Sequence, residues 1–403
     1  MQKNKSKTMK YLLGILCSVV LFAACSDDEK DKAEELDKRT VIVYVSAENN
    51  LHTFIESDLA EMTEGSKSIP EKMNLVAFVD NADKNTLPYI INIKNGERII
   101  DTDYSITEDF YASDPAKMHE TISWIMKKYP SESYGLVLWG HASGWLITND
   151  TISYNNQKKV MKRAYGGDNG NNSYYSSGKI WMNIPSMADM LERLPMKLDF
   201  IMADCCNFMG TETAYELRNA TNYIIGSPAE IPGNGAPYDK VVPKLFNLGN
   251  DFYKGIVDEY YNGYVDNVVL SVVKTSEMEE LAKATKSVMP ELLDEEIDTE
   301  GLIYYYGGNM KIMFDAKGLM KQNISQESYA NWQMALDKAV VYKKMSSKWD
   351  TMGYVNFSEF KVSEDIFGGL NMFVPLDMYD RYGYTHNSDI QKMEWYYATG
   401  MNK

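Results

Sequence analysis

The fold is decided by the stretch Leu198-Asp-Phe-Ile-Met-Ala-Asp-Cys-Cys206, in which a short apolar run ends in an acid and two adjacent cysteines. Such a run, bounded by polar residues, is typical of a buried parallel strand. Residues 212–218 then predict a helix. Asp204 and both cysteines are therefore expected at the carboxyl end of a strand, where open α/β sheets place their chemistry. A nearby helix N-terminus favours the thiolate form of a cysteine.

A second stretch upstream complements the first. Tyr134-Gly-Leu-Val-Leu-Trp139 predicts another apolar strand, and it continues into Gly140-His-Ala-Ser-Gly-Trp145. If the two strands are neighbours, His141 and a cysteine can form a nucleophilic pair. A purely structural loop histidine is the alternative. Three other histidines lack such a context and are expected to be structural or exposed: His52, His119 and His386.

Strands and helices alternate through the first part of the chain. Strands are predicted at 40–46, 74–79, 134–139, 198–203 and 223–226, with helices at 52–62, 115–129 and 185–194 and a hairpin at 89–100. This order predicts an α/β fold, a three-layer sandwich with a mainly parallel sheet, over residues 40–243.

Two regions depart from this pattern. Residues 148–180 are rich in Asn, Gly, Ser and Tyr and predict a long exposed loop. Beyond a boundary near residue 243, we expect a C-terminal α+β domain over 244–403. Its predicted helices are 245–265, 276–295 and 326–347, and its predicted strands are 268–273, 310–314 and 370–374.

Residues 1–25 are typical of a targeting signal. Lysines precede an apolar run, Tyr11 to Ala24, that is too short to span a bilayer comfortably. The run ends in Leu21-Phe-Ala-Ala-Cys25, which resembles the lipobox of bacterial lipoproteins and implies cleavage before a lipid-bearing Cys25. A simple secretory signal is the alternative. The charged residues 26–39 predict a flexible acidic tether.

The tether also bears on location. An acidic run directly after a lipid-bearing cysteine resembles surface-export signals of some Gram-negative lipoproteins. We therefore expect an outer-membrane lipoprotein, on the cell surface or the periplasmic side, that contacts the membrane through its N-terminal lipid only.

Composition narrows the function. The chain has 403 residues and a formal net charge of -16, which argues against a nucleic-acid partner.

Its cysteines are Cys17 in the signal, Cys25, and the vicinal pair 205–206, so the exported body has no disulfide framework. A free thiol in an oxidising compartment suits nucleophilic catalysis, with inert buried cysteines as the alternative. We find no Gly-x-Ser-x-Gly elbow and no metal-ligand motif.

Four stretches together resemble the clostripain family of cysteine peptidases, which have a caspase-like fold. They are Thr40-Val-Ile-Val-Tyr-Val-Ser-Ala-Glu-Asn-Asn-Leu51, Leu136-Val-Leu-Trp-Gly-His-Ala-Ser-Gly-Trp145, Asp204-Cys-Cys206, and Tyr223-Ile-Ile-Gly-Ser-Pro-Ala-Glu-Ile-Pro-Gly233 with Pro237-Tyr238. The family's Asp-x-Cys spacing selects Cys206 over Cys205. Asn207-Phe208 and Ala142 depart from the family's usual Leu-Met and Gly without removing a required atom.

The resemblance implies an endopeptidase that cleaves protein or peptide substrates after Arg or Lys. Cys206 is the expected nucleophile and His141 the general acid/base, with the backbone amides of Ala142 and Cys206 as oxyanion hole. Asp204 is expected to bind the basic P1 side chain, and Glu230 to line the same pocket. A turn-capping role is the alternative for Asp204.

The family is often activated by self-cleavage, which predicts a cut after Arg163 or Lys162 in the loop between His141 and Cys206. Calcium dependence is possible by family resemblance, although no cofactor is required by the sequence itself. We expect a monomer. The rival functions are a catalytically inactive caspase-like binding lipoprotein and an amidase or transpeptidase that uses the same Cys-His pair.

Overall fold

The computed structural model describes residues 36–82, 86–147, 164–170, 180–307, 310–351, 353 and 355–402. From Leu36 onward the chain forms one compact unit. Among the described residues, no helix combines the length and apolar character needed to cross a membrane.

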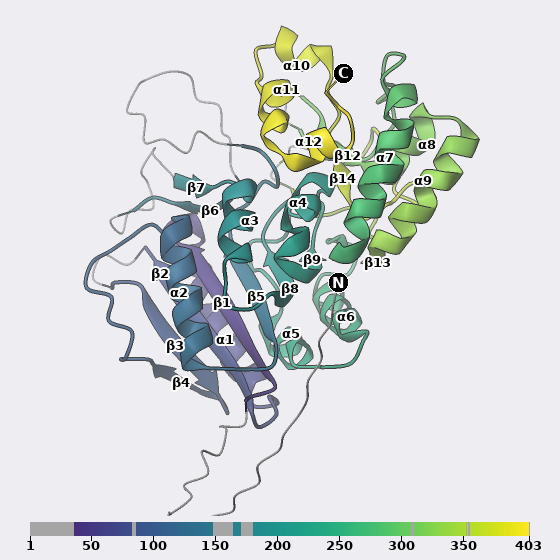
Figure 1. The fold of residues 1–403 in the computed structure, drawn as a ribbon. Helices are drawn as coiled ribbons and strands as arrows, with labels where there is room; N and C mark the ends of the chain where they lie inside the picture. Colours follow the sequence, from purple (N-terminus) through teal and green to yellow (C-terminus); the bar gives the residue numbers. More distant parts are fainter. Residues whose placement is uncertain are drawn as a thin grey trace, which may run out of the picture. The chain divides into compact units, whose positions relative to one another are not determined.

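A large mixed sheet is the centre of the fold (Figure 1). Its strand order is β13-β10-β9-β8-β5-β1-β2-β3-β4. The adjacent strands β2, β1, β5, β8 and β9 run parallel, and the strands at both edges pair antiparallel to their inner neighbours. The strands are β1 (Arg39–Ala47), β2 (Met73–Asn81), β3 (Tyr89–Lys94), β4 (Glu97–Ile100), β5 (Tyr134–Gly140), β8 (Leu198–Asp204), β9 (Thr221–Gly226), β10 (Leu270–Lys274) and β13 (Val340–Lys344).

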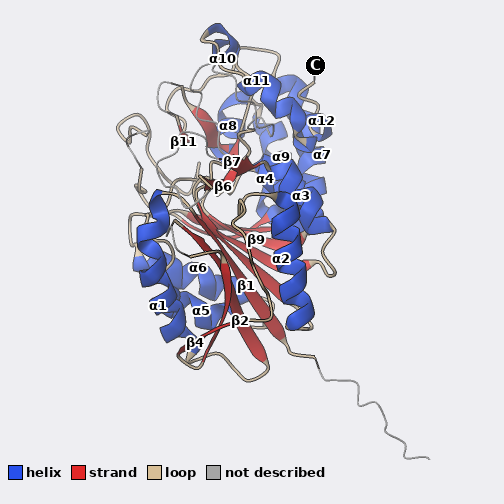
Figure 2. Ribbon diagram, turned by 90° about the vertical axis from the view of Figure 1, so that its left-hand side faces the viewer, coloured by secondary structure: helices blue, strands red, loops and turns tan. Residues whose placement is uncertain are grey.

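Helices cover both faces of this sheet, which makes three layers (Figure 2). One face packs against α1 (Ile55–Ser66), α5 (Tyr238–Leu245) and α6 (Phe252–Gly263). The other packs against α2 (Pro115–Lys128), α3 (Ile184–Glu192), α4 (Thr211–Glu216) and α7 (Met278–Leu292). Alternate residues of β1 enter the two cores, Val41 and Val43 on one side and Ile42 and Tyr44 on the other. Burial on both faces explains why the central strands are almost continuously apolar.

The predicted α/β class with a mainly parallel sheet is confirmed. The strands expected at 40–46, 74–79, 134–139, 198–203 and 223–226 are β1, β2, β5, β8 and β9. The helix α2 begins as its sequence indicates, because the side chain of Asp114 accepts from the amides of Ala116 and Lys117 and Pro115 follows it.

The predicted boundary near residue 243 does not separate two compact units. Strands β10 and β13 follow that position, yet they extend the central sheet through antiparallel pairing with β9 and with each other. The predicted helix 326–347 is also too long. Helix α9 (Gln326–Ala339) ends where the β-branched pair Val340-Val341 begins the edge strand β13.

The rest of the C-terminal part packs on the same unit. A small sheet has the order β11 (Tyr304–Tyr306), β12 (Ile312–Asp315), β14 (Asn371–Met372), and α8 (Ala316–Asn323) follows β12. Short helices end the chain: α10 (Asp377–Arg381), α11 (His386–Asp389) and α12 (Glu394–Ala398).

Two further predictions need correction. Residues 164–170 belong to the predicted exposed loop 148–180, but they are buried, and β6 (Tyr165–Asp168) pairs with β7 (Ile180–Met182). The Tyr165 hydroxyl donates to the Tyr44 carbonyl, which ties β6 to β1. The predicted tether 26–39 ends too late, because Arg39 is buried in β1 and donates to the Leu245 carbonyl.

Candidate active site

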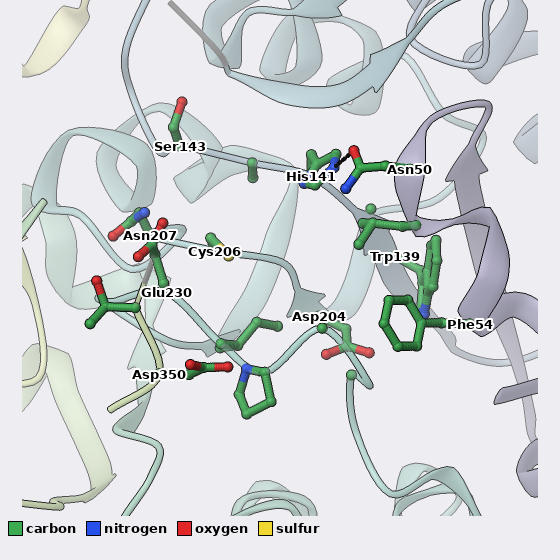
Figure 3. A pocket seen from close by; sticks show the side chains of 18 of the residues that line it. Asn50, Phe54, Trp139, His141, Ser143, Asp204, Cys206, Asn207, Glu230 and Asp350 are labelled. Carbon is green, nitrogen blue, oxygen red and sulfur yellow. Dashed lines mark hydrogen bonds between the residues drawn. The ribbon is translucent and has the colours of Figure 1, made fainter. Parts of the chain in front are cut away.

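The sheet brings the histidine and cysteine stretches to one edge. Strands β5 and β8 are parallel neighbours, and Trp139 pairs in register with Asp204. His141 and Cys206 each lie two residues further along, so both leave the sheet at the same end. They line one cavity of about 270 Å³, with Asp204 deeper inside it (Figure 3). The prediction that the two stretches lie on neighbouring strands is thus confirmed.

The two loops that carry these residues are in direct backbone contact. Gly144 has a φ of +61°, and a Cβ atom there would lie 2.6 Å from the Asn207 carbonyl oxygen. Only glycine allows both the conformation and the approach. The glycine after the histidine therefore sets how closely the histidine loop packs against the cysteine loop.

His141 is oriented by a residue that the sequence analysis did not single out. Its Nε2 lies 2.9 Å from Oδ1 of Asn50, which directly follows the N-cap residue of the turn after β1. The Trp181 ring lies 6.2 Å away, centroid to centroid. Asn50 belongs to the Asn-Asn-Leu ending of residues 40–51, the first of the stretches that resemble the clostripain family. This motif could have pointed to Asn50 as a site residue.

Cys206, and not Cys205, lines the cavity. Cys205 is buried in the core, as its 1% exposed surface shows. Burial raises the pKa of the Cys206 thiol to about 12, and the nearby acids Glu230 and Asp204 act in the same direction, against a hydrogen bond from the Ile231 amide. This burial opposes the helix N-terminus that was expected to favour the thiolate. The helix α4 begins only at Thr211 and is short, so burial prevails.

The backbone amides expected to form an oxyanion hole lie on opposite loops at the cavity. Ala142 and Tyr165 form an isolated antiparallel β-bridge. In this bridge the Ser143 amide donates to the Ala164 carbonyl, and the Gly166 amide donates to the His141 carbonyl. In this pattern the Ala142 N–H takes no part in the ladder. It can therefore serve a ligand in the cavity.

Asp204 is held at the inner end of the cavity by a set of donors. Its Oδ2 accepts from the Tyr238 hydroxyl at 2.6 Å and the Ala236 amide at 3.0 Å, and its Oδ1 accepts from the Tyr260 hydroxyl at 2.7 Å. Burial raises the pKa of Asp204, and these hydrogen bonds oppose that rise. The donors fix the carboxylate in place.

Comparison with known proteins gives the family. The model of the clostripain family matches residues 43–392. The chain belongs to the clostripain family. Clostripain from Hathewaya histolytica is 24% identical over 244 residues, which are 54% of this chain and 44% of clostripain. The chain thus spans less than half the length of that relative.

Solved structures extend the likeness to nearly the whole chain. A secreted cysteine protease from Bacteroides thetaiotaomicron, solved in complex with an irreversible peptide inhibitor, is 28% identical. It covers 91% of this chain and 99% of its own, with a TM-score of 0.74. An inactive zymogen protease from Parabacteroides distasonis is 26% identical with a TM-score of 0.72, and covers 90% of this chain and 97% of its own. Family and structures together support a clostripain-like cysteine peptidase.

Within this clostripain-family fold, further acids surround the cavity. Glu230 lines it, and Asp350 lines it from the C-terminal part of the chain, together with Tyr306 and Thr351. No lysine or arginine lies among the described residues that line the cavity. Asp350 is remote in sequence from every family-like stretch and lies in no motif, so sequence reasoning missed it.

The C-terminal part also supports the cysteine loop. The Asn371 amide donates to the Met209 carbonyl, and the Asn371 side chain donates to the Pro228 carbonyl at 2.9 Å. The Phe373 amide donates to Glu212 at 2.7 Å. In the clostripain-family chain these contacts place β14 directly behind the Cys206 loop.

Three predicted residues lie outside the described part of this clostripain-family chain: the processing residues Lys162 and Arg163, and the lipid-bearing Cys25.

Proposed function

We propose that the chain is a cysteine endopeptidase that cleaves peptide bonds after Arg or Lys. The observation that carries this proposal is the acidic cavity beside Cys206 and His141. Asp204, Glu230 and Asp350 line it without a basic residue among the described lining residues. A cationic side chain next to the scissile bond would compensate that charge.

The proposed chemistry uses His141 and Cys206, which line the same cavity. The thiol proton of Cys206 moves to His141, and the sulfur attacks the carbonyl carbon of the substrate. The amides of Ala142 and Cys206 stabilise the oxyanion. The protonated His141 then gives its proton to the leaving amine, and water hydrolyses the thioester with His141 as the base.

The raised pKa of Cys206 fits this sequence. Because burial keeps the sulfur protonated at neutral pH, the free enzyme does not hold a preformed thiolate–imidazolium pair. A basic P1 side chain that offsets the charge of Asp204 and Glu230 removes part of the cause of that high pKa. Substrate binding thus removes part of the charge repulsion that opposes thiolate formation.

The P1 side chain is recognised by fixed carboxylates. The donors Tyr238, Tyr260 and Ala236 hold Asp204. Both arginine and lysine can pair with it, and arginine gains more because its guanidinium can bind a carboxylate in a bidentate way. This arrangement supports protein or peptide substrates with a basic P1 residue.

Self-processing after Arg163 or Lys162 is part of the proposal. The described residues on either side, Ile147 and Ala164, are both buried. A cut between them leaves β5 on one fragment and β8 on the other, and these strands pair in the sheet. The fragments therefore stay associated. A relative that was solved as an inactive zymogen supports a precursor stage.

We also propose that Cys25 carries a lipid and anchors a monomeric enzyme at the outer membrane, on the cell surface or the periplasmic side. Metabolic labelling with a clickable fatty acid, compared between wild type and Cys25→Ala, tests this anchor.

The decisive experiment is a fluorogenic peptide panel with Arg, Lys, Asp and Leu at P1, run on wild type and Cys206→Ala. We expect turnover of the Arg and Lys substrates by wild type alone. The rival function, an inactive caspase-like binding module, predicts no turnover of any substrate and no labelling of Cys206 by a covalent probe with basic P1. Mass spectrometry of the same two proteins locates the processing bond, and a cut in Cys206→Ala would assign it to another protease.

A further inference from the structure

A second buried acid lies behind the wall of the cavity, on the side of Asp204. Asp58 belongs to α1, and only 3% of the residue is exposed. Its Oδ2 accepts from Nε1 of Trp139 at 2.7 Å. Trp139 lines the cavity (Figure 3), pairs in register with Asp204, and so projects from the same face of the sheet. Asp58 thus fixes an aromatic wall beside the carboxylate that is proposed to bind P1.

The carboxylates of Asp58 and Asp204 also approach each other. Gly235 lines the cavity, and a Cβ atom there would lie 2.7 Å from Oδ2 of Asp204 and 3.5 Å from Oδ2 of Asp58. Both oxygens are therefore within 4 Å of one point beside the cavity. The φ of Gly235 is +66°, which favours glycine and keeps this point free of a side chain. The inner end of the cavity is thus flanked by two acids.

Asp204 by itself has little capacity left for the donors of a basic side chain. An ionised carboxylate offers about four acceptor positions. The hydroxyls of Tyr238 and Tyr260 and the Ala236 amide each occupy one of them on Asp204. A guanidinium carries several N–H donors in a planar fork, so most of them need a further acceptor. Asp58 can supply that acceptor from the adjoining wall.

The charge of Asp58 is not balanced within the described part of the chain. The charged groups that act on it are Asp204 and Glu61, both acids, and no described lysine or arginine pairs with it. Burial and the charge of Asp204 raise the pKa of Asp58 to about 8, against the hydrogen bond from Trp139. A cation that enters beside Asp204 would favour the ionised form of Asp58.

We propose that Asp58 determines the choice between arginine and lysine at P1, in favour of arginine. This inference rests on the proposed cleavage after basic residues. The planar guanidinium stacks on the ring of Trp139 and spans the carboxylates of Asp204 and Asp58. The ammonium of lysine is a compact charge without a planar face, so it gains less from the ring and from the second carboxylate. The same preference favours Arg163 over Lys162 as the processing residue.

The test compares two fluorogenic peptides that differ only in Arg or Lys at P1. The ratio of their kcat/KM values is measured for wild type, Asp58→Asn and Glu61→Gln. Asparagine keeps an acceptor for the Trp139 indole but cannot carry the charge. Glu61→Gln is the matched control, because it removes another acid of α1, whose carboxylate accepts from the Tyr238 amide at 2.9 Å instead.

The pH dependence of the ratio separates the charge of Asp58 from a structural role. Asp58 is mostly protonated below pH 8 and ionised above it, so the Arg/Lys ratio of wild type should rise about fivefold from pH 7 to pH 9. Both substrates stay charged there, since a lysine side chain has a pKa of about 10.4. The facing groups are Asp204 on β8, Glu61 on α1, and the hydroxyls of Tyr238 on α5 and Tyr264 after α6. Both hydroxyls stay protonated because their pKa values are raised.

At pH 9 we expect Asp58→Asn to lower kcat/KM about 10-fold for the Arg substrate and much less for the Lys substrate. It should also remove the rise of the ratio with pH, and Glu61→Gln should retain that rise. If wild type cleaves both substrates but Asp58→Asn has the same ratio, Asp58 does not select P1, while the proposed function stands. Turnover of neither substrate by wild type overturns both. If Asp58→Asn does not fold or is not processed, the pH dependence of wild type and Glu61→Gln decides, and a ratio that is constant with pH refutes the role of Asp58.

Discussion

The imidazole of His141 donates its Nε2 proton to the amide oxygen of Asn50 across 2.9 Å. This bond selects the tautomer, because a neutral ring that donates from Nε2 carries its basic lone pair on Nδ1. It also fixes the rotation of the ring above the cavity (Figure 3). In the proposed Cys-His dyad, an amide from the turn after β1 would thus take the orienting part that a third residue plays in other nucleophile–base systems.

Asn50→Ala should therefore lower kcat by about 10-fold, since one oriented hydrogen bond contributes about 0.5–1.5 kcal/mol. The KM for an Arg substrate should change little, because Asn50 lies on the histidine side of the cavity rather than beside Asp204. Steady-state kinetics on the purified variant check this. Leu51→Ala, at the neighbouring lining residue, is the matched control. Equal losses in both variants would mean that Asn50 only shapes the turn.

The Cys206 thiol should be slow toward a simple alkylating agent. Because burial raises its pKa to about 12, only a very small thiolate fraction exists at pH 7.5 in the free enzyme. The iodoacetamide rate should rise about 10-fold per pH unit from pH 7 to 10, as the thiolate fraction does. A chloromethyl ketone with P1 Arg should react much faster at pH 7.5. A plateau of the iodoacetamide rate near pH 7 would instead show a preformed thiolate.

The central strands could be predicted from the sequence for a simple physical reason. β1, β5 and β8 are buried on both faces, so each contains a run of apolar residues, 41–45, 136–139 and 200–203, that polar residues bound. The edge strand β13 offered no such pattern. Its residues are all half-buried, and it continues directly from α9 without a turn signal, so it resembled more helix.

The site residues also fall into those that the sequence could place and those that it could not. His141 and Cys206 could be paired because parallel strands end at a common edge. Asp350 could not be placed, because it approaches the cavity from a segment without regular structure after β13.

Asp204→Asn tests the recognition of the basic P1 side chain. Loss of the charge should lower kcat/KM for an Arg substrate by about 10- to 100-fold, because a hydrogen bond to a charged group contributes about 1.5–3 kcal/mol. Tyr238→Phe is the control, since it removes one donor to Asp204 but leaves the charge. Its effect on kcat/KM should be smaller. Equal turnover of Arg and Leu substrates by wild type would refute a charge-based pocket.

Gly144→Ala should damage the site without touching either reactive residue. At a φ of +61°, an added Cβ would lie 2.6 Å from the Asn207 carbonyl oxygen, so the two loops must separate. We expect at least a 10-fold loss of kcat/KM and a lower melting temperature. Gly353→Ala is the control: φ is positive there too, but an added Cβ would have no atom within 4 Å. This variant therefore measures the backbone strain alone, without a steric clash. An active and stable Gly144→Ala variant would show that the loop contact is dispensable.

The pH dependence of stability should be reduced when a buried acid behind the cysteine loop is neutralised. Burial raises the pKa of Glu212 from 4.5 to about 7, against a hydrogen bond from the Phe373 amide. Between these two values the folded chain binds more protons than the unfolded chain, so the free energy of unfolding falls as pH rises. Above pH 7 the free-energy cost of keeping an ionised Glu212 buried is fully present.

Glu212→Gln keeps an acceptor for the Phe373 amide but cannot ionise. Urea unfolding of Cys206→Ala at pH 5 and pH 8, with and without this change, measures the effect. The drop in unfolding free energy between the two pH values should shrink by up to about 3 kcal/mol. Glu132→Gln, at an exposed carboxylate, should leave the drop unchanged. If Glu212→Gln leaves it unchanged as well, Glu212 stays ionised in the fold, and the Phe373 amide offsets its burial.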